Sequence, residues 1–383
     1  MVKKILAGVV AVFAAAGFAQ TVVDVTGIGA EKTSVSINVG NSAYAKCLQK
    51  NLEISGLFIV KGDGAIKVTG ASGAVTAVGK GKSLSASDSF ADEKSARMAA
   101  RKFANAMCEA YGDQKGFALD KVIFLNRGKA AKGGVMVPGE LCVAYPDGYD
   151  IRQLTSDKTA AVYPRWKKGG EGIYYIGYLK GAPQIWEMDI NSGKRNVKWS
   201  FKGSPTGIAV APDGRRVAAI LSFQGNPELY VLDGERYIRL TNTPNASEGQ
   251  PTWSPDGTKI AYVSDETRRP QIYVVDVNTK KKRRLTAKGR ENLDPDWGVD
   301  GRITYITKRG GAQIAIMGVE GDSSSKVLTT EGTWEHPSWA RDSRHVVADR
   351  DGALFIVDTM EGGDKPRRMF YANGNWISPS WSK

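Results

Sequence analysis

The sequence predicts a mainly β protein in which a six-bladed β-propeller follows a small α/β domain. One phrase, best preserved as QPTWSPDGTKIAYVSD at residues 250–265, occurs in six variants along the chain. Its tryptophan position recurs at intervals of 44, 43, 44, 42 and 42 residues. Each full interval holds four short β-rich runs separated by turn residues, which is the pattern of one propeller blade. The aligned positions are Trp166, Val210, Trp253, Trp297, Trp339 and Trp381.

The chemistry of one copy explains its strands. Trp253 ends a first strand, and residues 254–257 (SPDG) form a tight turn. Proline fixes φ there, aspartate bonds its own backbone, and glycine accepts a positive φ. The runs 259–264 and 271–276 follow as the next strands, and RLT at 284–286 ends the fourth. A β-sandwich is the alternative fold, but it gives no reason for evenly spaced copies of one four-strand unit.

The ends of the repeat predict how the ring closes. The last copy, at residues 378–383, stops after its first strand. Runs that match the second, third and fourth strands lie far upstream at 121–126, 140–144 and 150–155. We therefore expect the first and last segments of the propeller to share one blade, which leaves no unpaired sheet edge between them.

Residues 1–19 have the features of a secretory signal peptide. Lys3 and Lys4 precede an apolar stretch from Ile5 to Ala16, and small residues follow before Gln20. This stretch is shorter than the ~20 residues that a membrane-spanning helix requires. Because no cysteine follows the expected cut, we do not expect a lipid anchor. The mature chain is predicted to be exported to the periplasm.

Between the signal peptide and the propeller, residues 20–116 form the predicted α/β domain, and the propeller takes 117–383. The domain has alternating patterns that predict strands and 3.6-residue patterns that predict helices. The expected elements are strands at 21–25 and 34–39, helices at 43–51 and 92–111, and a glycine-rich hairpin at 65–78.

Three cysteines are an odd count for an exported protein. Cys142 stands where other blades have Tyr230 and Tyr273, so we expect a buried strand residue. Cys47 and Cys108 lie on the two predicted helices of the α/β domain. They could form a disulfide if these helices pack side by side, and the sequence leaves that open.

The chain is basic, with a formal net charge of +13. The run KKKRR at 280–284 would indicate nucleic-acid binding or nuclear import in a cytosolic protein. Behind a signal peptide we expect no nucleic-acid partner, and we interpret the run as a solvated outer strand whose lysines discourage edge-to-edge pairing. A basic surface can also favour acidic envelope polymers.

The sequence offers little for catalysis, and we expect no enzymatic activity, cofactor or metal. The run 78–83 ends like a phosphate-binding loop but lacks the first glycine of that motif. The run 294–301 resembles a calcium loop, yet Gly298 and Tyr305 stand where oxygen ligands belong. The chain has two histidines and no GxSxG motif.

The order of these features resembles the TolB family of the Tol-Pal system of Gram-negative envelopes. The specific similarity lies in LQKNLEISGLFIV at 48–60, ELCVAYPDGYDIRQLT at 140–155 and the terminal SPSWS at 378–382. Departures are a shorter N-terminal domain, Val210 in place of tryptophan, and the high charge. The resemblance implies a monomeric, non-catalytic periplasmic adaptor that supports outer-membrane integrity and constriction at cell division.

The resemblance also implies two partners, with no direct membrane insertion. The residues just before each PxW lead into an innermost strand and should ring one mouth of the channel, where the family binds Pal, the peptidoglycan-associated lipoprotein. These residues are Tyr163, Thr206, Glu248, Gln250, Asn292, Leu293, Asp294, Glu335 and His336.

The start of the mature chain aligns with the segment by which the family binds TolA. Its alternating valines suit a strand added to a partner's sheet, although it could simply be the first strand of the α/β domain. The residues are Gln20, Thr21, Val22, Val23, Asp24 and Val25. The alternative function is an exported propeller that binds cell-wall glycan or another polyanion through its basic surface.

Overall fold

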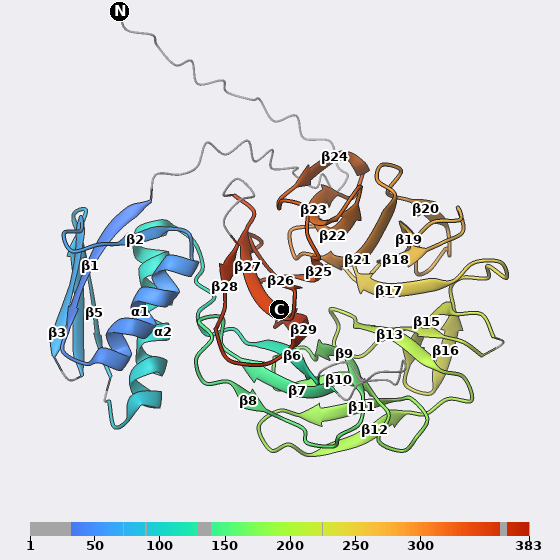
Figure 1. Cartoon of the computed structure of the whole chain (residues 1–383), viewed down its shortest axis with the longest axis horizontal. Helices are drawn as coiled ribbons and strands as arrows, with labels where there is room; N and C mark the ends of the chain where they lie inside the picture. Colours follow the sequence, from blue (N-terminus) through green and yellow to red (C-terminus); the bar gives the residue numbers. More distant parts are fainter. Residues whose placement is uncertain are drawn as a thin grey trace, which may run out of the picture.

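The computed structural model describes residues 32–71, 73–88, 90–128, 139–223, 225–360 and 366–382, without the side chains of 322 and 323. These residues form a five-stranded sheet with two helices, beside six four-stranded sheets set in a ring (Figure 1). The predicted fold class is therefore confirmed. The predicted signal peptide (1–19) and TolA-binding segment (20–25) lie outside the described residues.

The α/β region has the sheet order β2-β1-β3-β4-β5, in which β2 and β3 run parallel to β1 and the rest is antiparallel. The hairpin predicted at 65–78 is present, and a third strand that we did not predict, β5, continues it. The elements are β1 (Thr33–Val39), α1 (Ser42–Ile54), β2 (Phe58–Val60), β3 (Ile66–Ala71), β4 (Ala74–Gly79), β5 (Lys82–Ser87) and α2 (Glu93–Gly112).

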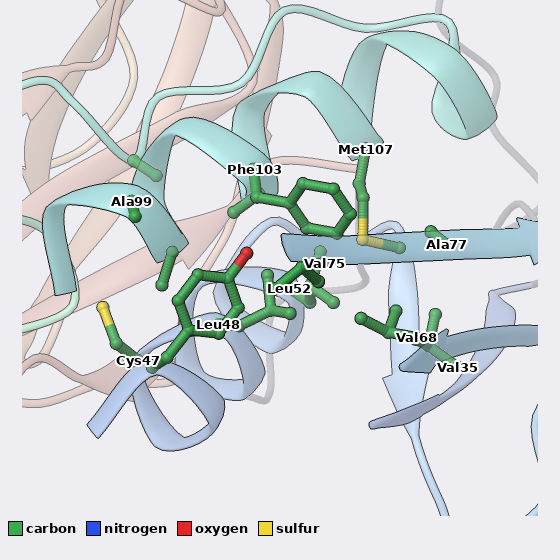
Figure 2. Close-up of a cluster of buried hydrophobic side chains, with 14 of the residues drawn as sticks. Val35, Cys47, Leu48, Leu52, Val68, Val75, Ala77, Ala99, Phe103 and Met107 are labelled. Atoms are coloured by element: carbon green, nitrogen blue, oxygen red, sulfur yellow. The ribbon is translucent and has the colours of Figure 1, made fainter. Parts of the chain in front are cut away.

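Helix α2 begins at a capping box. The Asp92 carboxylate accepts a hydrogen bond from Ser95 N at 2.7 Å, and Ser95 Oγ accepts one from Asp92 N at 2.9 Å. Its buried face includes Ala96, Ala99, Phe103 and Met107. In Figure 2, Phe103 and Met107 of this helix lie against valines of the sheet and leucines of α1. No described helix is long and apolar enough to cross a membrane.

The cysteine predictions have mixed outcomes. Cys142 is buried in β7, as expected. The disulfide between Cys47 and Cys108 is not formed, and both are buried free thiols. The reason for Cys47 is local, because its Sγ lies 3.3 Å from Asp147 Oδ2, in a turn of the propeller.

Each propeller sheet contains four antiparallel strands, and the predicted closure is confirmed. Strand β29 pairs with β6, with Trp381 opposite Val122, so the end of the chain completes the blade that the propeller starts with. That blade contains β29 (Trp376–Trp381), β6 (Val122–Arg127), β7 (Gly139–Ala144) and β8 (Arg152–Gln153).

The other five blades follow in chain order, and in each the first strand lines the centre. They are β9 (Ala161–Trp166), β10 (Gly172–Gly177), β11 (Gln184–Asp189) and β12 (Arg195–Trp199); β13 (Pro205–Val210), β14 (Val217–Leu221), β15 (Glu228–Asp233) and β16 (Arg236–Arg239); β17 (Glu248–Trp253), β18 (Lys259–Ser264), β19 (Gln271–Asp276) and β20 (Lys282–Arg284); β21 (Glu291–Trp297), β22 (Ile303–Lys308), β23 (Ala312–Gly318) and β24 (Gly321–Val327); and β25 (Glu335–Trp339), β26 (His345–Arg350), β27 (Ala353–Asp358) and β28 (Arg367–Arg368).

The repeated tryptophan joins neighbouring blades. Trp253 Nε1 donates to Ala209 O of the preceding blade at 3.1 Å, and Trp166 Nε1 donates to Ser380 O at 2.8 Å. Trp297 Nε1 donates instead to Gly301 O, in the turn that follows its own strand, at 2.9 Å, so the partner of the indole differs between blades. Val210 has no indole N–H to donate and is only half-buried.

The α/β region packs tightly on the propeller. Gly56, between α1 and β2, has a φ of +69°, and a Cβ there would lie 2.2 Å from Asp358 Oδ2 of β27. Only glycine allows this approach. Nearby, Ile54 joins a buried cluster with Phe117 and Trp381. The predicted boundary at 116/117 falls in the segment between α2 and β6.

Candidate functional site: the propeller channel

The inner strands share a backbone feature that shapes the channel. Five residues that precede a proline have a positive φ, and in each strand the pairing register shifts there. Proline fits a β-bulge because it has no N–H to pair. The bulge turns successive residues toward the channel. The five are Tyr163 (φ 51°), Gln250 (49°), Asp294 (50°), His336 (49°) and Ser378 (52°).

A cavity of about 410 Å³ lies where the six inner strands meet. At one end it is lined by Gln250, Asp294 and His336, at the bulges. At the other end it reaches Pro255 and Val299, in the turns that follow the tryptophans. The cavity therefore occupies the part of the channel toward these turns.

A chain of hydrogen bonds crosses the channel wall at the level of the bulges. Gln250 Nε2 donates to Asp294 Oδ1, and Gln250 Oε1 accepts from Asp294 N at 3.0 Å. Asp294 Oδ2 accepts from His336 N at 3.2 Å. His336 Nδ1 lies 2.9 Å from Asp349 Oδ1, which also accepts from Ser378 N at 3.1 Å. Four consecutive blades are thus joined, and three of the linking residues, Gln250, Asp294 and His336, line the cavity.

A second set of bonds lies two residues further along the same strands. Thr252 Oγ1 accepts from Trp297 N at 3.0 Å, and Asp296 Oδ2 accepts from Trp339 N at 2.7 Å. Ser338 Oγ accepts from Trp381 N at 3.1 Å. These residues occupy the middle position of PxW. The sequence held this signal, a polar residue between proline and tryptophan, but our prediction did not use it.

The channel carries charges of both signs. Burial lowers the pKa of His336, but Asp294, Asp349 and Glu335 outweigh it and raise the pKa to about 9. His336 is therefore an imidazolium at neutral pH. Burial lowers the pKa of Arg165, which also lines the cavity, against the opposing effect of Asp296. Two cations on different blades thus lie near four carboxylates.

Among the described residues, one group has the spacing of a metal site. The donor atoms of Glu335, His336 and Asp349 lie within 4.8 Å of one another. His336 would have to lose its proton before it could bind a metal, because metal ligation requires the neutral imidazole. The arrangement is an ion pair, and we assign no metal to it.

The structure divides the predicted mouth residues into four groups. Gln250, Asp294 and His336 line the cavity, and Arg165, Thr252, Asp296, Ser338 and Asp349 accompany them without having been predicted. Tyr163 and Leu293 are half-buried. Thr206 and Glu335 are exposed near the starts of their inner strands, away from the turns that follow the tryptophans.

Glu248 and Asn292 differ from the expected mouth position because both are buried, with exposed fractions of 4% and 1%. Glu248 Oε1 accepts from Thr243 Oγ1 at 2.7 Å. Asn292 Nδ2 donates to Gln271 Oε1 at 2.8 Å. The Asn292 bond joins β21 to β19 of the preceding blade, and both residues have little surface to offer a partner.

Comparison with models of known protein families matches most of this chain to one family. The model described as the TolB beta propeller domain matches residues 109–383. The Tol-Pal system protein TolB of Desulfosudis oleivorans is 28% identical over 145 residues, which are 37% of this chain and 31% of that protein. The chain thus spans about a third of the length of this curated relative.

Two solved structures share the fold. TolB from Acinetobacter baumannii has a TM-score of 0.78 and 20% identity, with coverage of 92% of this chain and 97% of that one. The putative TolB from Agrobacterium tumefaciens has a TM-score of 0.52 and 18% identity, with coverage of 68% and 92%. At these identities the likeness concerns the fold alone.

Proposed function

Because the chain belongs to the TolB β-propeller family, we propose that it is a non-catalytic periplasmic adaptor of the Tol-Pal system. In this proposal the channel binds Pal, and residues 20–25 bind TolA. The adaptor supports outer-membrane integrity and constriction of the outer membrane during division. The name of the Desulfosudis oleivorans relative supports membership of the system, and the predicted signal peptide supports the periplasmic location.

One observation carries the Pal proposal: the polar lining of the channel is already fixed before any partner arrives. Gln250, Asp294 and His336 are held by bonds to neighbouring blades while they still face the cavity. A preorganised surface loses little side-chain entropy on binding. Because these bonds already use the charged groups of the channel, no catalytic role is needed to explain their presence, which fits a non-catalytic adaptor.

The TolA part of the proposal concerns residues outside the described structure. The segment precedes β1, which starts at Thr33 in the interior of the α/β sheet. Alternating valines at 23 and 25 suit addition to the sheet edge of a partner. Deletion of residues 20–25 should abolish TolA binding and leave Pal binding intact.

The Pal proposal is tested by calorimetric titration of residues 20–383 with the soluble domain of Pal from the same organism, at two salt concentrations. Glu335, which is exposed at the end of an inner strand, is changed to lysine. Reversal of a charge at the interface should weaken binding about tenfold. The control is Glu320→Lys, the same charge change at an exposed position between β23 and β24.

Saturable one-to-one binding that Glu335→Lys weakens and Glu320→Lys does not would support a site at the channel. Absence of binding at both salt concentrations would contradict the Pal proposal. Equal loss in both variants would contradict the channel as the site, because it would reflect the overall charge.

A further inference from the structure

The positive charge of this protein is concentrated on one blade. Residues 259–290 contain ten lysines and arginines against three acidic residues, an excess of +7 in a chain whose total is +13. All ten are exposed. We call them the basic blade face: Lys259, Arg268, Arg269, Lys280, Lys281, Lys282, Arg283, Arg284, Lys288 and Arg290.

The centre of this face is the outermost strand of the blade. Strand β20 pairs with β19 on one side only, with Arg284 opposite Tyr273 and Lys282 opposite Val275. Lys280 and Lys281 precede β20, and Arg268 and Arg269 lie in the loop that leads into β19. The cations therefore extend along the outer edge of the blade from one end toward the other.

The acidic residues of this stretch neutralise little of the charge. Glu266 pairs with Lys282 at 2.7 Å. Asp276 instead accepts from the backbone N of Asn278 and Thr279 at 3.1 and 2.8 Å, so its carboxylate is used to hold the turn. Lysine and arginine head groups thus dominate the face.

Other outer strands show what edge protection alone requires. Arg195 of β12 forms an ion pair with Asp157, and Arg239 of β16 pairs with Glu228 at 2.9 Å. One or two charges are enough to discourage edge-to-edge pairing. Five successive cations on one edge exceed that need, so the basic blade face calls for a partner of opposite charge.

We propose that the basic blade face binds the phosphate head groups of an anionic lipid surface. Clusters of four to eight lysines and arginines bind such surfaces through charge alone. The two aromatic residues of the stretch, Tyr262 and Tyr273, are buried and offer no ring on which a base or a sugar could stack. A lipid surface needs no stacking, and the predicted export brings the chain to a compartment bounded by lipid.

This contact differs from the binding of Pal and does not depend on it. The face belongs to the outside of the blade, whereas the cavity is lined by inner strands such as β17. Binding is electrostatic and peripheral, with no segment inserted into the membrane. It would hold the adaptor close to a membrane whether or not a protein partner is bound.

The test is co-sedimentation of residues 20–383 with vesicles of phosphatidylglycerol and phosphatidylcholine, against pure phosphatidylcholine vesicles, at low and high salt. The variant is Arg269→Glu, Lys281→Glu and Arg284→Glu. Because each cation near an anionic surface contributes roughly one kcal/mol, three reversals should weaken binding by about a hundredfold or more. The control makes three equal changes at exposed lysines of the α/β region: Lys46→Glu, Lys61→Glu and Lys67→Glu.

Salt-sensitive binding to the anionic vesicles that the blade variant loses and the control retains is the expected result. A milder variant, Lys281→Gln with Arg284→Gln, should fall between wild type and the triple variant, and thermal melting checks that each is folded. Absence of binding at low salt, or equal losses in variant and control, would overturn the proposal. Tighter binding to heparin or duplex DNA than to the vesicles at the same salt would also overturn it, since the face would then serve another polyanion.

Discussion

Two polar networks in this protein use the same kinds of side chain in opposite ways. At the junction of the α/β region and the propeller, Arg101 and Asp147 are both fully buried, with side-chain exposures of 0%. In the channel, His336 keeps 26% of its side chain exposed while its partner Asp349 keeps 4%. The first network is closed to solvent, and the second is open toward a cavity.

The two networks differ in how many hydrogen bonds their carboxylate oxygens accept. Asp147 accepts from Arg101 Nε at 2.7 Å and Nη2 at 3.1 Å, from Asn51 Nδ2 at 2.9 Å and from Tyr149 N at 2.9 Å. The Arg101 guanidinium also stacks on the Tyr145 ring, 3.8 Å from its centroid. Such a closed network, in which both oxygens of Asp147 accept hydrogen bonds, fixes two parts of the chain together, whereas an open one retains a surface for a partner.

Breaking the closed network should have the largest effect. Arg101→Met leaves the Asp147 carboxylate buried without its cation, which should lower the free energy of unfolding by about 3–5 kcal/mol. Urea denaturation followed by circular dichroism measures this loss. The control is Arg97→Met one turn earlier, where the arginine is 19% exposed and pairs with Asp150 and Glu93.

The control should lose less, about 1–2 kcal/mol, because solvent reaches the Arg97–Asp150 pair and Asp150 keeps Arg101 as a second cation at 2.9 Å. Equal losses for Arg97→Met and Arg101→Met would show that burial is not what distinguishes the two pairs.

The sequence predicted the parts of the fold that are built from repeats. Even spacing of PxW fixed the number of blades, and the terminal stub fixed how they close. The junction could not be predicted in this way, since Arg101 and Asp147 are 46 residues apart and belong to no shared repeat. The family-like segment YPDGYD at 145–150 marked the place without showing its partner.

The channel was predicted in part for a physical reason. Residues directly before a proline, such as Gln250 and Asp294, lie at the bulges and face the cavity. Glu248 lies two residues earlier in the same strand and is buried. Strict alternation along a strand would put Glu248 and Gln250 on one face, but the bulge changes the phase between the two faces.

The open network in the channel should make the stability of the protein depend on pH. The pKa of His336 is raised from 6.5 to about 9 in the folded protein, so its contribution is fully present below pH 6.5 and is lost as pH rises through 9. Stability should fall by about 2 kcal/mol across this window, less than the full shift implies because the site is partly solvated.

The matched variant is His336→Gln, which should remove this pH dependence between pH 7 and 9. The measurement is the urea midpoint as a function of pH. A wild-type midpoint that stays constant over this range would contradict the imidazolium assigned to the channel.

The smallest effect on stability should come from Glu248 of β17, a buried carboxylate that lacks a strong cation partner. Burial, with a further contribution from Glu228, raises the pKa of Glu248 from 4.5 to about 7. A raised acid pKa means that stability falls as pH rises from 4.5 through 7, because the folded state must then hold a buried charge. Glu248→Gln avoids that charge and should increase stability by about 1 kcal/mol above pH 7, after the loss of part of its hydrogen bonding.

Glu228 is the matched control, since it is equally buried but pairs with Arg239 at 2.9 Å and accepts from Thr241 Oγ1 at 2.6 Å. Burial raises its pKa, yet these bonds outweigh burial and leave the pKa lowered. Glu228→Gln should therefore destabilise the protein at pH 8 by about 1–2 kcal/mol, opposite in sign to Glu248→Gln. If both variants shifted the urea midpoint in the same direction, the hydrogen bonds and ion pairs at each carboxylate would not explain its effect on stability. The distinction between closed and open polar networks would then fail for these two residues.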